Sequence, residues 1–192
     1  MTDAAGTALG MAAARRLRNL GIVDIRPGLT AAELAAAEER FGFVFADDHR
    51  AFLAAGLPLL ARGHCEHPDR ASWGWPDWRD LGSEELRSQV DWPVDTVLEE
   101  IGAGHWPHGW GSRPADPAEA LDEARSRLAE VPRMVPVYAH RYLPAGRGTS
   151  GHAVLSIHRL TDIIVYGANL AEYIGREFHD TWTAVPFWGD YV

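Results

Sequence analysis

The pattern of apolar and polar residues is most regular between residues 135 and 178. Residues 135–142 and 153–158 alternate between apolar and polar side chains, which is typical of half-buried strands. Residues 163–166 form a continuous apolar run that predicts a third strand, covered on both faces. A helix follows, because Asn169 and Glu172 have the spacing of a capping box.

Helical periodicity predicts further helices over residues 4–20, 30–41, 47–55, 83–90 and 117–131. The clearest local signal belongs to the second of these, where Thr30 and Glu33 form a capping box. Asp47 or Asp48 is predicted to cap the next helix, because aspartate accepts hydrogen bonds from the first turn.

Pro93 divides one helical region of the sequence. The helix over residues 83–90 is predicted to end before Trp92-Pro93, since proline removes a backbone donor. Residues 94–101 then form either a second helix or a short strand. With three strands and several helices in 192 residues, the sequence predicts a single α+β domain. Its sheet is expected to be mixed, mainly antiparallel, and packed by helices.

Composition narrows the class of partner. The formal net charge is −9, and every basic residue except histidine is arginine. An acidic chain without lysine is poorly suited to phosphate backbones, so we expect no nucleic-acid partner. A basic protein is the better match. Cys65 is the only cysteine, which suits a reducing compartment and predicts a cytoplasmic protein. No apolar run reaches the length of a membrane span, so no membrane partner is expected.

Three tryptophans, Trp73, Trp75 and Trp78, lie within six residues. Tryptophan closes the edges of cores, where its ring N–H finds a partner. It is also enriched at the centres of protein interfaces. The sequence leaves both interpretations open, and the second makes these residues candidates for binding a partner.

Histidine and cysteine cluster twice, at His64-Cys65-Glu66-His67 and at His105 with His108. These residue types are the usual ligands of zinc. Neither cluster is followed by a second pair at the spacing of a zinc finger. The sequence therefore predicts no bound metal and no cofactor.

Polar side chains on the predicted strands allow two interpretations. Ser156, His140 or His158, and Asp162 have the residue types of a catalytic triad, but no G-x-S-x-G turn surrounds the serine. The alternative is a buried polar network that ties the strand ends together, formed by His140, Arg141 and Asp162 and joined by Arg113. We expect the network rather than catalysis.

Several segments, taken in their order along the chain, resemble the SUKH superfamily in its bacterial form. The segments are GLTAAELAAAEERFGFVFADDHRAFLAAG, WGSRP, VPVYAHRYLP, AVLSIHRLTDIIVYGANLAEYI and PFWGDYV. The likeness covers residues 28–192 and leaves residues 1–27 as an N-terminal helical extension. The chain departs from the pattern at Ala46, where the superfamily has a proline, and this places the local turn in doubt.

The resemblance implies an α+β fold and a non-enzymatic role in binding proteins. Bacterial members are immunity proteins proposed to neutralise toxins, often nucleases, of polymorphic toxin systems. Fungal relatives regulate cell-wall synthesis through protein partners. The expectation is therefore an immunity protein with a basic toxin domain as its partner. The alternatives are a regulatory scaffold protein or a metal-dependent hydrolase.

Overall fold

The computed structural model describes residues 3–59 and 73–178. Its helices are α1 (Ala4–Leu20), α2 (Ala31–Phe41), α3 (Asp47–Ala55), α4 (Glu84–Gly102), the 3-10 turn η1 (His108–Trp110), α5 (Pro117–Glu130) and α6 (Leu170–Glu177). Its strands are β1 (Asp24–Arg26), β2 (Leu57–Leu59), β3 (Met134–Tyr138), β4 (Arg141–Pro144), β5 (Val154–Arg159) and β6 (Asp162–Gly167). The His64-Cys65-Glu66-His67 cluster, which the sequence predicts not to bind a metal, and the PFWGDYV segment lie outside the described residues.

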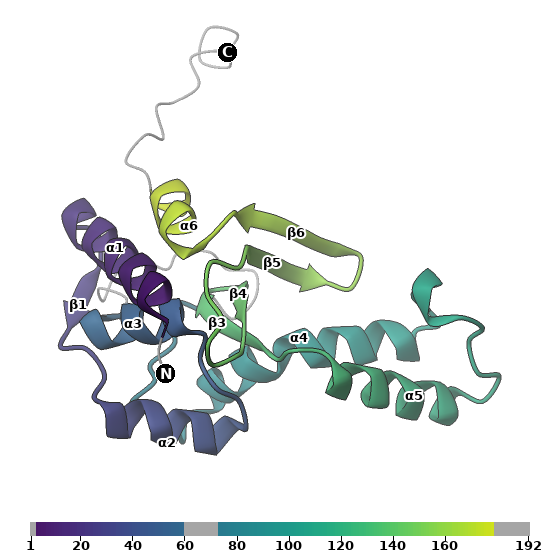
Figure 1. Cartoon of the computed structure of the whole chain (residues 1–192). Coiled ribbons are helices and arrows are strands. Elements are labelled where there is room, and N and C mark those ends of the chain that lie inside the picture. The colour runs from purple at the N-terminus through teal and green to yellow at the C-terminus, as the bar shows by residue number, and fades with distance from the viewer. Residues whose placement is uncertain (1–2, 60–72, 179–192) are drawn as a thin grey trace, which may run out of the picture.

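Two antiparallel sheets are present. β1 pairs with β2, and the larger sheet has the order β3-β4-β5-β6. Helices α1, α3 and α6 lie on one side of the larger sheet, and α4 passes along the other (Figure 1). The predicted α+β class with a mainly antiparallel sheet packed by helices is confirmed.

Residues 135–142 form two strands and not the single strand that alternation predicts. The chain reverses at Ala139, whose φ of 47° lies in the left-handed region. Hydrogen bonds hold this residue on both sides. The Ala139 N–H donates to the Gly74 carbonyl at 2.9 Å, and Gln89 Nε2 donates to the Ala139 carbonyl at 2.9 Å. Both partners are distant in sequence, so local alternation does not reveal the turn.

Helix α4 continues through Pro93, and the prediction that Trp92-Pro93 ends it is wrong. Proline lacks the N–H that would bond the Gln89 carbonyl one turn earlier. The Tyr142 hydroxyl of β4 donates to that carbonyl at 3.0 Å instead. Trp92 Nε1 donates to the Ile157 carbonyl of β5 at 3.1 Å. The sheet therefore supplies the hydrogen bond that the proline removes.

Helix α1 packs against α3 and α6 and contributes Ala13, Ala14 and Leu17 to the main core. Gly10 allows the close approach to α3, because an added Cβ would collide with the Asp48 carbonyl. The residues predicted to be an extension therefore share one core with the remainder of the described chain.

Asp47 and Asp48 do not cap α3 as predicted, since its N-cap is Ala46. Both aspartates are buried in the first turn. Asp47 Oδ2 accepts from the Asp3 N–H at 2.6 Å, and Asp48 Oδ2 accepts from the Gly151 N–H at 2.9 Å. The two carboxylates thus join α3 to the start of α1 and to the glycine-rich loop after β4.

A second hydrophobic cluster lies between α4 and α5. Val97 and Ile101 of α4 pack against Ala120 and Ala124 of α5. The ring centroids of Trp106 and Trp110, which flank this cluster, are 5.3 Å apart. The α4–α5 pair extends away from the main core (Figure 1).

Candidate functional site

The tryptophan cluster is divided between core and surface. Trp78 is 1% exposed, and its ring meets those of Phe41, Phe43 and Phe45 edge-on. Trp75 is 7% exposed and packs in the main core. The interpretation of these two rings as surface anchors is therefore wrong, because a packed aromatic core already surrounds them.

Trp73 is half-buried, and its ring meets that of Trp92 at a centroid distance of 5.3 Å. It is the member of the tryptophan cluster that retains exposed surface.

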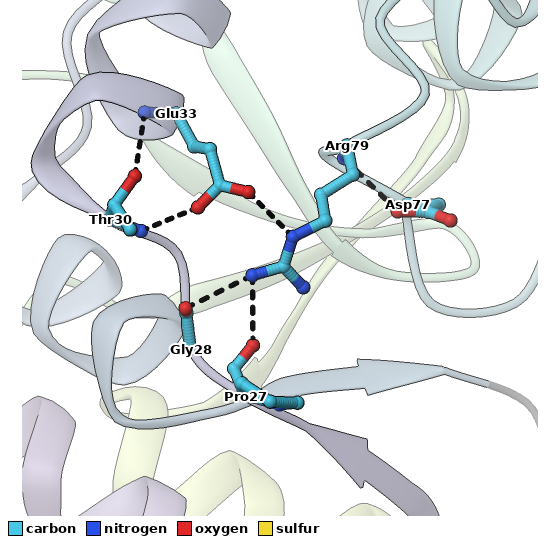
Figure 2. A network of polar contacts seen from close by, with 6 residues as sticks. All are labelled: Pro27, Gly28, Thr30, Glu33, Asp77 and Arg79. Carbon is cyan, nitrogen blue, oxygen red and sulfur yellow. Dashed lines mark hydrogen bonds and ion pairs between the residues drawn. The ribbon is translucent and has the colours of Figure 1, made fainter.

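The segment that carries these tryptophans is fastened to the start of α2 (Figure 2). Arg79 Nε donates to Glu33 Oε1 at 2.6 Å, and Arg79 Nη2 donates to the carbonyls of Pro27 and Gly28. The other oxygen of Glu33 accepts from the Thr30 N–H, as the capping box predicts. The hydrogen bond from Arg79, followed by those from Thr30, lowers the pKa of Glu33 to about 2. The network therefore holds the backbone at Pro27 and Gly28 against the segment that contains Arg79.

Arg141 is the centre of a buried polar cluster between the sheet and α6. Its Nη1 donates to Ser156 Oγ at 3.0 Å, and its Nε lies 3.4 Å from Glu177 Oε2. Its guanidinium carbon lies 3.8 Å from the centre of the Tyr166 ring. Burial raises the pKa of Glu177, and Arg141 opposes that shift. This is the pattern expected of a buried ion pair.

His140 lies beside this buried cluster, and the charge of Asp162 affects it. The His140 and His158 ring centroids are 5.1 Å apart and nearly perpendicular. Burial, followed by the charges of Arg141 and His158, lowers the pKa of His140 to about 4, and Asp162 opposes this shift. His140 is thus neutral at pH 7. Three of the four predicted network residues share one electrostatic environment.

Arg113, the fourth, lies elsewhere. Its Nη2 donates to the Ile101 carbonyl at 3.3 Å, and its Nη1 donates to the Pro114 carbonyl at 3.4 Å. These contacts place it at the C-terminal end of α4, beside the second cluster. The prediction that it joins the Arg141 network is wrong. The sequence of the Gly/Pro-rich loop around Arg113 does not indicate which backbone carbonyls the arginine side chain will contact.

The triad alternative is not assembled in the described part of the chain. Ser156 Oγ accepts its hydrogen bond from the Arg141 guanidinium, while the His140 ring meets the His158 ring edge-on. A guanidinium donates protons and does not accept them, so it provides no base for the serine.

The β6 strand presents an exposed apolar surface. Ile163, Ile164 and Val165 are 43%, 51% and 62% exposed, so the prediction that both faces are covered is wrong. Adjacent strand residues point to opposite faces, so both faces of β6 are open here. The β5–β6 hairpin reaches beyond the helices that cover the sheet (Figure 1). A continuous apolar run does not reveal this, because the position of a strand in its sheet decides its burial.

The described residues contain neither a candidate metal site nor a candidate membrane-spanning helix. Residues 3–59 and 73–178 hold no group of three or more His, Cys, Asp or Glu that could bind a metal ion. Among the described helices, none is long and apolar enough to cross a membrane.

Comparison with protein-family models, with curated proteins and with solved structures finds no significant match to this chain. The resemblance to the SUKH superfamily thus stays a prediction from its motifs.

Proposed function

We propose that this chain is a non-enzymatic protein-binding domain, and that its partner is a basic toxin domain that it neutralises as an immunity protein. The observation that carries the proposal is the apolar surface of β6. Exposed large hydrophobic side chains that gather in one place, and are not scattered singly, are characteristic of a binding site. Ile163, Ile164 and Val165 are three of the six large hydrophobic side chains that are exposed among the described residues, and they are consecutive.

Charge supports the choice of a basic partner. A net charge of −9 steers cationic partners toward the chain and accelerates their association. Nuclease toxins are a suitable class, because a phosphate-binding surface is basic and an acidic protein can occupy it. The SUKH resemblance points to the same class.

The test is co-expression with the toxin domain encoded nearest to this gene. Cells that also express this chain should survive. The variant Ile163→Lys/Val165→Lys should lose protection, because it replaces the apolar surface with charges that repel a basic partner. The matched control is Met11→Lys/Ile22→Lys, which adds the same charge at two exposed apolar positions outside β6.

Death of cells that carry the unaltered chain, at the rate seen without it, would refute the immunity role. A regulatory scaffold protein would then be the better hypothesis. Equal loss of protection in both lysine pairs would show that charge and not β6 is responsible.

A further inference from the structure

We propose that β6 is an open sheet edge to which an extended segment of a positively charged partner adds as a fifth antiparallel or parallel strand. This inference rests on the proposed binding function and specifies how the same surface works. β6 terminates the sheet order of the described residues. Folded proteins usually block such edges with lysine, proline or a bulge. Residues 163–165 contain neither lysine nor proline, and their own register with β5 is regular, although the register shifts on either side of them.

The register of β5 against its two neighbouring strands determines which peptide groups of β6 face outward. The Ile157 N–H donates to the His140 carbonyl at 2.9 Å, so Ile157 directs its peptide groups toward β4. In an antiparallel pair these directions alternate, so the neighbouring Ser156 faces β6. Ser156 is paired with Ile164, which therefore bonds to β5.

It follows that Ile163 and Val165 direct their N–H and C=O groups away from β5. The described residues place no further strand on that side. An added strand would satisfy these groups, while its side chains would meet Ile163 and Val165 on one face and Ile164 on the other. The edge thus offers both backbone hydrogen bonds and apolar contacts.

The net charge of the chain indicates which kind of segment pairs with the edge of β6. Two copies of a chain with charge −9 repel each other, which disfavours pairing of β6 with β6 of a second copy. A segment with alternating apolar and cationic residues gains both the apolar contact and the attraction. The occupant is therefore an extended, proline-free segment of a basic protein.

The experiment is a titration with an eight-residue peptide of alternating valine and arginine. Val165→Pro removes the outward N–H and keeps an apolar side chain of similar size, and proline is tolerated at an outward-facing edge position. Val165→Thr keeps the N–H and makes the side chain more polar. Thermal unfolding first establishes that both variants are folded.

Strand addition predicts that the peptide binds, that Val165→Pro weakens binding by about tenfold, and that Val165→Thr weakens it by less than about threefold. An acidic peptide of alternating valine and glutamate should bind more weakly than the cationic one. Absence of binding, a larger loss in Val165→Thr than in Val165→Pro, or equal affinity for the two peptides would overturn the proposal. So would sedimentation showing that the chain dimerises through β6. None of these results depends on the toxin, so the proposed function is tested separately.

Discussion

Tyr142 shows how a single side chain stabilises an element distant in sequence. Its hydroxyl donates to the Gln89 carbonyl, which lacks its usual helical partner because residue 93 is proline. Burial raises the pKa of this hydroxyl well above its ordinary value, so it remains a donor at all physiological pH. A buried carbonyl without a donor is costly, and this bond removes that cost.

We therefore expect Tyr142→Phe to lower the free energy of unfolding by about 1–3 kcal/mol. Pro93→Ala restores the missing N–H, so the same substitution should cost about 1 kcal/mol less in that background. Urea unfolding of the two single variants and the double variant measures this difference. Equal costs in both backgrounds would contradict the role assigned to Tyr142.

His49 links stability to pH. It is fully buried beside Phe45, and burial lowers its pKa to about 3, against about 6.5 for an unperturbed histidine. Between these values the unfolded chain binds a proton that the folded chain does not. The stability that depends on neutral His49 is present above about pH 6.5 and is lost as the pH falls toward 3.

The variant His49→Phe has no titratable group at residue 49, so its unfolded chain no longer binds this additional proton. Between about pH 5 and 6, we expect the slope of unfolding free energy against pH to be lower in the variant by about 1 kcal/mol per pH unit. Denaturant titrations at several pH values compare the two slopes. A variant slope as steep as that of the unaltered chain would refute the assignment.

At the scale of elements, α1 is held by close helix packing. An added Cβ at Gly10 would lie 2.8 Å from Ala51 Cβ and would also meet the backbone of α3. Gly10→Ala should therefore destabilise the fold by about 1–3 kcal/mol through overpacking. This is opposite to the effect of helix propensity, which favours alanine by about 1 kcal/mol.

Gly102 at the end of α4 provides the matched control, because nothing lies within 4 Å of an added Cβ there. Gly102→Ala should be neutral or stabilising by up to about 1 kcal/mol. Thermal unfolding compares the two variants. Stabilisation by both substitutions would show that α1 and α3 can separate without cost.

Local signals predicted elements well, and tertiary contacts did not follow from them. The capping bonds at Thr30 and Asn169 involve residues three apart, and the structure contains both. The donor that the Gln89 carbonyl lacks because residue 93 is proline is supplied by Tyr142, from another element. Burial of Trp78 and exposure of Val165 depend on the neighbours that the fold provides, which an apolar pattern does not specify.

The contacts of the candidate site also depend on tertiary structure, which local sequence signals do not specify. Arg141 and Asp162 both act electrostatically on His140, although β5 lies between the strands that carry Arg141 and Asp162. Glu177, the carboxylate that neutralises Arg141, comes from α6 and was not predicted. Its position in the last turn of an ordinary amphipathic helix carries no signal of that contact.

At the scale of the whole molecule, one packed body carries an exposed hairpin. Helix α4 contacts β3 and β5, and α6 contacts β6. Within residues 3–59 and 73–178, Ile163, Ile164 and Val165 of β6 are exposed on both faces, and no further strand pairs along the edge. The formal net charge of the chain is −9, and a negative net charge favours association with a basic partner. We therefore propose that a partner binds at β6.

Amide hydrogen exchange of the chain, alone and mixed with the neighbouring toxin domain, tests that claim most directly. The amides of Ile163 and Val165 face outward and should exchange at least about tenfold more slowly in the complex. The amide of Ile164, already bonded to β5, should change less. A complex in which the β6 amides keep their free exchange rates would contradict the account, and so would failure of the two proteins to form a complex.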